Sequence, residues 1–189
     1  MTDDLRSPSP LARFDAIFTA HQRAVLAYAM RRTPNLADAE DVVAETFATA
    51  WRKLGSIPDP EPLPWLYAVA RRILANQRRG SGRRERLAAL MRVHDVPTPM
   101  RLGDDLDGPA FAALASLSPA DQEVLRLVAW EELGNLQIAQ VLGITPNAVA
   151  IRLHRARSRF ADALKDSDSS RTSTRMQGTH RAAWKGVAE

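Results

Sequence analysis

Apolar residues recur every three or four positions along most of this sequence, and proline or glycine follows the end of most such stretches. That spacing places apolar side chains on one side of a helix, whereas a half-buried strand would alternate polar and apolar residues. No stretch shows a convincing alternation of this kind. The sequence therefore predicts an all-α fold built from amphipathic helices.

The N-terminal half is predicted to contain three helices, over about residues 11–32, 35–54 and 64–79, with a proline-rich loop over 56–64. Asn35 can cap the second helix with its side-chain oxygen. The apolar stripe that we expect to be buried on this second helix consists of Val43, Phe47, Ala50, Trp51 and Leu54.

The segment Gly80-Ser81-Gly82 is expected to break the third helix, because glycine is a poor helix former, and a short helix is expected over 83–94. Residues 95–108 are rich in proline, glycine and aspartate, a composition typical of a linker. An extended linker of this length reaches about 50 Å.

The second domain opens with residues 109–117. Two later helices should start at Ser118-Pro119 and Thr145-Pro146, where a capping residue precedes proline at the first helical position. The residues that we expect to be buried in the helix after Ser118 are Val124, Leu125 and Val128.

The stretch from Leu136 to Val149 has the pattern of a helix-turn-helix. Its first helix is predicted over 135–142, Gly143 supplies the turn, and the second helix runs to about Leu164. The core of this motif is predicted to consist of Ile138, Ala139, Leu142, Ile144 and Val149. In such a motif the second helix lies in the DNA major groove. A plain helical hairpin is the alternative.

Together these features predict two small helical domains that are joined by a flexible linker, the second of which contains the helix-turn-helix. The predicted organisation is a disordered N-terminus at 1–10, a helical domain at 11–94, a linker at 95–108, a helix-turn-helix domain at 109–165 and a disordered tail at 166–189.

Basic residues gather in two blocks, over 65–86 and 145–165, and the stretch between them is acidic. Two separate basic blocks indicate two nucleic-acid footprints on one chain. Two solvated helix faces would give the same pattern, so the charge distribution alone leaves both interpretations open.

The composition argues against several kinds of site. The chain has no cysteine, and its four histidines, His21, His94, His154 and His180, lack the spacing of metal ligands. No apolar run approaches the roughly 20 residues of a membrane span, and the N-terminus lacks the apolar region of a signal peptide. We therefore expect no catalytic residue, metal, cofactor or membrane insertion, and a cytoplasmic protein that is not an enzyme.

Three motifs, taken in order, carry a resemblance to a known family: Asp38 to Trp51, Trp65 to Asn76, and Leu117 to Arg157. They resemble region two, its promoter-binding helix and region four of the extracytoplasmic-function (ECF) group of bacterial RNA polymerase sigma factors. The resemblance implies a subunit that directs core polymerase to specific promoters and assists promoter opening. It implies RNA polymerase core, promoter DNA and an anti-sigma factor as partners.

The resemblance assigns the contact with the clamp helices of the polymerase's largest subunit to Asp38, Asp41 and Glu45. Their spacing places the three carboxylates on one helix face, where they can meet a basic partner. From the residues alone, a solvated acidic face is an equal alternative.

The resemblance assigns the downstream, minus-ten promoter element to the proline-rich loop, which in the family captures a flipped base, and to the helix after it. The residues assigned to this element are Ser56, Ile57, Asp59, Trp65, Tyr67, Arg71, Arg72, Asn76, Arg78 and Arg79. The arginines would hold phosphates, and Trp65 and Tyr67 would stack on bases, with a core position for Trp65 as the alternative.

The resemblance assigns the upstream, minus-thirty-five element to the second helix of the helix-turn-helix. The residues assigned to it are Asn147, Ala148, Ala150, Ile151, Arg152, His154, Arg155, Arg157 and Arg159. Ala150 and Ile151 replace polar residues common in the family, so we expect readout through thymine methyl groups, Arg155 and DNA shape.

An ordinary helix-turn-helix regulator of the LuxR type is the competing hypothesis for residues 117–145. That hypothesis leaves the helices at 38–51 and 65–79 without a role.

Overall fold

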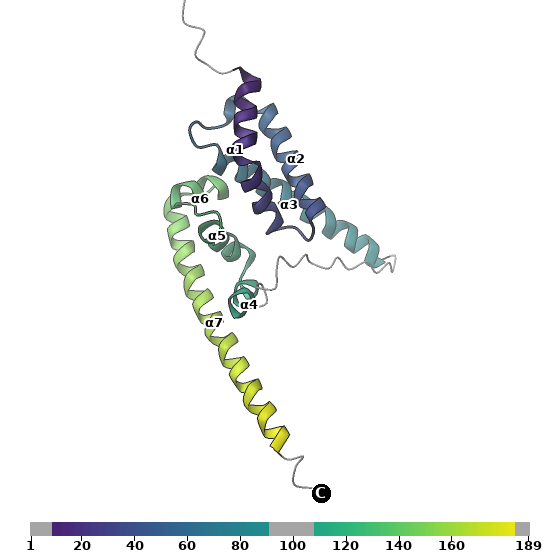
Figure 1. Cartoon of the computed structure of the whole chain (residues 1–189), viewed down its shortest axis with the longest axis vertical. Helices are drawn as coiled ribbons and strands as arrows, with labels where there is room; N and C mark the ends of the chain where they lie inside the picture. Colours follow the sequence, from purple (N-terminus) through teal and green to yellow (C-terminus); the bar gives the residue numbers. More distant parts are fainter. Residues whose placement is uncertain (1–8, 91–107, 184–189) are drawn as a thin grey trace, which may run out of the picture. The chain divides into compact units, whose positions relative to one another are not determined.

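The computed structural model describes residues 9–90 and 108–183, and side chains over 9–79 and 108–166 (Figure 1). Within these ranges every regular element is helical, which confirms the predicted all-α fold. The elements are α1 (Pro10–Met30), α2 (Leu36–Arg52), the 3-10 helix η1 (Leu54–Ser56), α3 (Leu63–Leu90), α4 (Pro109–Ser116), α5 (Pro119–Ala129), α6 (Asn135–Leu142) and α7 (Pro146–Ala183). The chain separates into two compact units, one built on α1, α2 and α3 and the other on α4, α5 and α7. The predicted linker at 95–108 lies almost wholly outside the described residues, so the exact domain boundaries stay a prediction.

In the first unit, α1, α2 and α3 pack against one another. The predicted cap of α2 is confirmed, since the Asn35 side chain accepts a hydrogen bond from the Asp38 N–H at 2.8 Å. The fully buried side chains of this unit include Val25, Tyr28, Val42 and Leu66.

The buried face of α2 differs from the predicted stripe. Phe47 and Ala50 are buried as expected, but Trp51 is 48% exposed, and Val43 and Leu54 are only half-buried. Residues of α2 that are completely buried instead are Ala39, Val42 and Thr46. Thr46 was not predicted to be buried because threonine is polar. Its hydroxyl donates a 2.6 Å hydrogen bond to the Val42 carbonyl, and this bond satisfies the polar atom inside the core.

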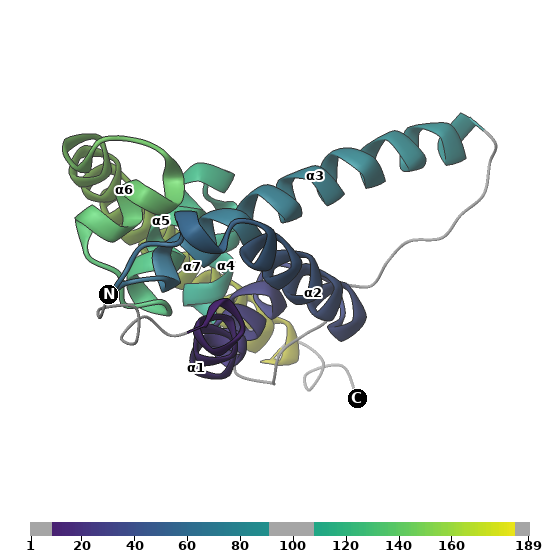
Figure 2. The same ribbon diagram turned by 90° about the horizontal axis from the view of Figure 1, so that it is seen from above.

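The predicted break at Gly80-Ser81-Gly82 was wrong, because α3 continues through these residues to Leu90. Its C-terminal half projects beyond α1 and α2 (Figure 2). Glycine in a helix interior costs only about 1 kcal/mol relative to alanine, and no proline is present to remove a backbone donor. The same continuous helix replaces the start of the separate helix that we expected over 83–94, and residues 91–94 lie outside the described part.

In the second unit, α7 packs against α4 and α5. The cap at Ser118 is confirmed, since its hydroxyl accepts a hydrogen bond from the Asp121 N–H at 3.2 Å. Val124 is fully buried as predicted, but Leu125 and Val128 are half-buried, and Leu127 is fully buried. As on α2, the helix is amphipathic as predicted, but its buried face is rotated around the helix axis from the predicted one.

Residues 143–145 form the turn between α6 and α7. Gly143 has a φ of +68°, a left-handed conformation that glycine adopts without strain. The Thr145 hydroxyl accepts a hydrogen bond from the Ala148 N–H at 3.2 Å and caps α7. In α6, Ile138 and Ala139 are buried as predicted, whereas Val141 takes the buried position that we assigned to Leu142. Ile144 is half-buried.

The helix α7 is longer than predicted. It runs to Ala183 rather than to about Leu164, so the disordered tail expected over 166–189 was wrong as far as residue 183. This stretch is polar but contains no proline, so composition alone did not identify an end to the helix. Among the described residues, no helix combines the length and apolar character that a membrane span requires.

Candidate functional site

The carboxylates of the predicted acidic face lie on the first half of α2. Asp41 and Glu45 are exposed, whereas Asp38 is half-buried. The Asn35 side-chain amide donates a 3.1 Å hydrogen bond to Asp38, whose own N–H is held by the Asn35 cap. Asp38 therefore has a structural role at the helix N-terminus, and Asp41 and Glu45 are the carboxylates that present themselves to solvent.

The same stripe of α2 changes its charge toward the C-terminus. Thr49 and Arg52 follow Glu45 at intervals of four and three residues, so they continue one side of the helix. The Arg52 guanidinium donates a 3.0 Å hydrogen bond to the Thr49 hydroxyl. Over roughly 20 Å of helix, the stripe runs from acidic at Asp38 to basic at Arg52.

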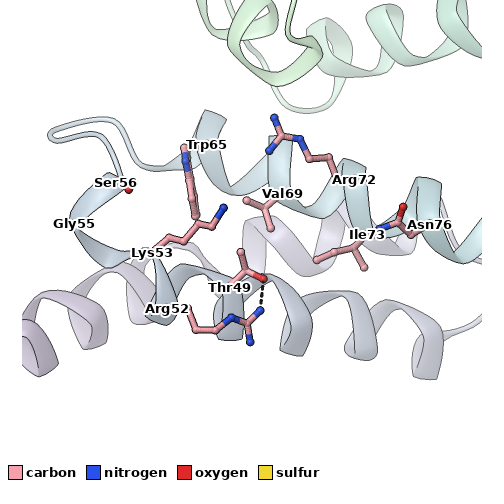
Figure 3. Close-up of a pocket in the computed structure, with 10 residues that line it drawn as sticks. All are labelled: Thr49, Arg52, Lys53, Gly55, Ser56, Trp65, Val69, Arg72, Ile73 and Asn76. Atoms are coloured by element: carbon pink, nitrogen blue, oxygen red, sulfur yellow. Dashed lines mark hydrogen bonds between the residues drawn. The ribbon is translucent and has the colours of Figure 1, made fainter.

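A hollow of about 530 Å³ opens beside the basic end of this stripe. Figure 3 shows side chains of α2 and α3 on two sides of it. Its lining residues are Thr49, Arg52, Lys53, Gly55, Ser56, Trp65, Val69, Arg72, Ile73 and Asn76. Three of these side chains are cationic and three are apolar, a combination that suits a flat, hydrophobic group attached to an anion.

Four of the residues assigned to the downstream element meet at this hollow: Ser56, Trp65, Arg72 and Asn76. The half-buried Trp65 lines the hollow together with Val69 and Ile73 because residues four apart share one side of α3. The Asn76 side-chain oxygen also accepts a hydrogen bond from Arg79, which lies one turn further along the helix.

Two of the assigned residues are part of the core instead. Tyr67 is 3% exposed, and its ring stacks on Tyr28 with 4.8 Å between centroids, so the expected stacking on a base was wrong. Tyr67 lies two positions after Trp65, which places it on another side of the helix. Ile57 is equally buried, and its carbonyl accepts a 2.9 Å hydrogen bond from Arg13.

The remaining residues of that assignment lie around the unit. Asp59 is exposed on the loop, and Arg71 is half-buried on α3. Arg78 donates a 3.3 Å hydrogen bond to the carbonyl of Arg32, in the turn that follows α1. Arg78 therefore connects two elements of the unit as well as carrying charge at its exposed surface.

The contribution of α2 to the hollow was not predicted from the sequence. Thr49, Arg52 and Lys53 were not assigned to any site, although they line it. The available signal was the basic pair Arg52-Lys53, which comes directly before the loop that was assigned to the same element.

In α7, one side is buried and the opposite side is exposed. Val149, Leu153 and Ala156 are buried, in the i, i+4, i+7 pattern of a single face. Of the residues assigned to the upstream element, Ala148 and Arg152 are half-buried. The exposed members of the set are Asn147, Ala150, Ile151, His154, Arg155, Arg157 and Arg159.

One of these arginines is engaged by the protein itself. Arg159 donates a 2.6 Å hydrogen bond to the carboxylate of Asp121, which is only 4% exposed. Burial raises the pKa of Asp121, but hydrogen bonds from Arg159 and Ser118, with the positive charges of Arg159 and Arg152, outweigh it and leave the pKa below its ordinary value. The assignment of Arg159 to DNA alone therefore overlooked its structural ion pair.

Two families of known proteins match this chain. The family Sigma-70 region 2 matches residues 17–84, and the family Sigma-70, region 4 matches residues 110–160. The ECF RNA polymerase sigma factor SigL of Mycobacterium tuberculosis is 33% identical over 146 residues, which cover 75% of this chain and 82% of SigL. The chain belongs to the ECF group of RNA polymerase sigma factors.

Other relatives of this sigma factor differ in length. CarQ of Myxococcus xanthus is 29% identical over 158 residues, 80% of this chain and 88% of CarQ. The probable sigma factor RfaY of Xanthomonas campestris is 31% identical over 154 residues, and the match spans 77% of this chain but only 38% of RfaY.

Solved structures resemble the sigma factor as well. RpoE from Bartonella quintana, solved with the anti-sigma factor NepR, has a TM-score of 0.62 and 25% identity over 80% of this chain and 96% of that chain. CnrH, solved with the cytosolic domain of CnrY, has the same fold, with a TM-score of 0.56 over 81% of this chain and 88% of that chain. The sigma factor is thus a transcription initiation factor, and the LuxR-type hypothesis finds no support.

Proposed function

We propose that this sigma factor contacts the RNA polymerase core through the exposed carboxylates of α2, with Asp41 and Glu45 as the principal contacts. The observation that carries this proposal is the change of charge along one stripe of α2. An acidic segment suits a basic polymerase surface, and the basic segment that follows leads to the hollow. Polymerase and DNA strand would then meet the same side of one helix. Charge bias toward helix ends is the simpler explanation of the stripe, and the experiment below separates the two.

The hollow is the proposed site for an unstacked base of the downstream promoter element. Its apolar side chains, with Trp65 at one edge, support a base, and Lys53 and Arg72 support the phosphates that flank it. Ser56 and Asn76 supply polar groups at the lining, and Asp59, Arg71, Arg78 and Arg79 stay candidates for the surrounding strand.

The exposed side of α7 is the proposed reader of the upstream element. Asn147, His154 and Arg155 are candidates for base edges, and Arg157 is the candidate for a phosphate. Arg152, Arg159, Ala148 and Ala150 lie at the borders of this side.

The protein acts, in this proposal, as a cytoplasmic binding subunit without catalytic activity of its own and without a cofactor. RpoE and CnrH were solved with a regulatory partner, and we extend this to the present chain: an anti-sigma factor keeps it from polymerase until transcription is required.

The test is transcription in vitro with purified core polymerase and the variant Asp41→Arg, Glu45→Arg. Both side chains are exposed, so each change should alter the free energy of unfolding by no more than about 0.5 kcal/mol. We expect loss of core binding and of transcription with an unchanged helical circular-dichroism signal.

The matched control is Glu40→Arg. Glu40 is an exposed carboxylate of the same helix, but it lies about 100° around the helix from Asp41, about 140° from Glu45 and about 160° from Asp38. The control should bind core as the unmodified protein does. The assigned stripe would be wrong if the double variant bound core as tightly as the unmodified protein does. It would also be wrong if Glu40→Arg lost as much core binding as the double variant.

A further inference from the structure

We propose that Ile151 reads the methyl group of a thymine in the upstream promoter element. This inference rests on the proposed placement of α7 in the major groove. The sequence left three modes of readout open: thymine methyl groups, Arg155 and DNA shape. The inference names one of them, the thymine methyl group, and the residue that contacts it.

The position of Ile151 on α7 is the first argument. It follows Val149 by two residues and precedes Leu153 by two, and both of these are buried. Two residues correspond to about 200° of helix rotation, so Ile151 points away from the buried side. It lies in the second turn of α7, among the early residues that contact base edges in a recognition helix.

The exposure of Ile151 is the second argument. Ile151 is 45% exposed. Among the residues of α7 whose side chains the structure describes, it is the one large apolar residue that is exposed. Asn147 lies one turn before it and His154 one turn after it, and both are exposed. The resulting surface is a single apolar spot between two polar side chains.

The chemistry of the major groove supplies the third argument. Thymine is the base that offers an apolar group there, its C5 methyl, and apolar side chains recognise thymine through it. Ala150 is also exposed, but it follows Val149 directly and so lies at the border of the exposed side. Arg155 is cationic and suits the acceptors of guanine. Ile151 is therefore the residue whose shape, position and polarity match the methyl group.

The experiment removes this methyl group from the DNA without changing a hydrogen bond. The upstream element preferred by the holoenzyme is first selected from a randomised template, and each thymine in it is then replaced singly by deoxyuridine. At one position we expect deoxyuridine to weaken holoenzyme binding by roughly three- to fivefold, the effect of exposing one methyl group.

The variant Ile151→Ala completes the comparison. It should bind the thymine and the deoxyuridine templates equally, while Ile151→Val keeps part of the discrimination. The control Arg157→Ala alters an exposed, cationic residue of the same helix and should weaken both templates while leaving their ratio unchanged.

Several results would overturn the inference. These are a preferred element without thymine, an unmodified protein that ignores deoxyuridine at every position, and an Ile151→Ala variant that still discriminates. In each of these cases selective transcription by the holoenzyme would leave the proposed function intact. A holoenzyme that binds no promoter would overturn the proposed function and this inference together.

Discussion

Asp121, in the first turn of α5, and Arg159, in the fourth turn of α7, form an ion pair with 2.6 Å between Oδ2 and Nη1. The carboxylate is almost completely buried, and the Ser118 cap lies beside it. The pair therefore links the start of one helix to the arginine-rich segment of another. Arg159, which was assigned to DNA from the sequence, therefore also helps to hold α7 against α5.

The first prediction concerns the stability that this pair provides. Arg159→Ala leaves a buried carboxylate without its cationic partner, so we expect a loss of about 1–3 kcal/mol in the free energy of unfolding. Arg157→Ala removes an exposed arginine of the same helix and should change it by no more than about 0.5 kcal/mol. Urea denaturation of both variants measures the difference. Equal stabilities would mean that the pair contributes nothing.

The second prediction concerns how the stability provided by Asp121 depends on pH. The pKa of Asp121 lies below its ordinary value of 3.8 in the folded protein. Its charged form therefore stabilises the fold above that ordinary value, and the contribution disappears as the pH falls through the lower folded pKa. The stability difference between the unmodified protein and Asp121→Asn should be constant near neutral pH and should shrink below about pH 4.

The control for this experiment is Asp162→Asn. Asp162 also pairs with a cation, Lys165 at 3.4 Å, but both side chains are largely exposed. Exposed pairs contribute about 0–1 kcal/mol, so this variant should show little difference at any pH. A difference for Asp121→Asn that does not change with pH would contradict the expectation.

The third prediction separates core from binding surface on α3. Tyr67→Ala removes a buried ring that stacks on Tyr28, and we expect a loss of about 3–5 kcal/mol in the free energy of unfolding without any DNA present. Trp65→Ala changes a half-buried side chain at the hollow, so it should cost less stability but should impair promoter opening. Thermal unfolding and transcription assays on both variants decide whether the two roles are assigned correctly.

The fourth prediction concerns the turn before α7. Gly143 has a positive φ, and a Cβ atom added there would meet no atom within 4 Å, so only backbone strain opposes a side chain. Gly143→Ala should therefore cost about 1–2 kcal/mol, and Gly143→Asn less, because asparagine tolerates this conformation better. Gly55→Ala is the control, since the added Cβ at Gly55 also has open space around it. A Gly143→Ala variant that is as stable as the unmodified protein would contradict the backbone strain expected for a side chain at this position.

Features that depend on a few neighbouring residues could be predicted from the sequence. The caps at Asn35, Ser118 and Thr145 lie where their residue types indicate, because a cap needs only the N–H groups two or three positions away. Gly143 likewise forms the expected turn. The order of the three motifs was also sufficient for the family, since it does not depend on how side chains pack.

The tertiary structure alone decided which side of each helix is buried and which charged groups are paired. Tyr67 is a core residue because Tyr28 of α1 meets it, and Asp121 holds Arg159 across 38 positions of sequence. The hollow exists because the end of α2 lies beside the start of α3. The physical reason is that burial and ion pairing depend on atoms that approach only in the folded chain, whereas helix spacing shows amphipathic character without fixing which neighbour covers each face.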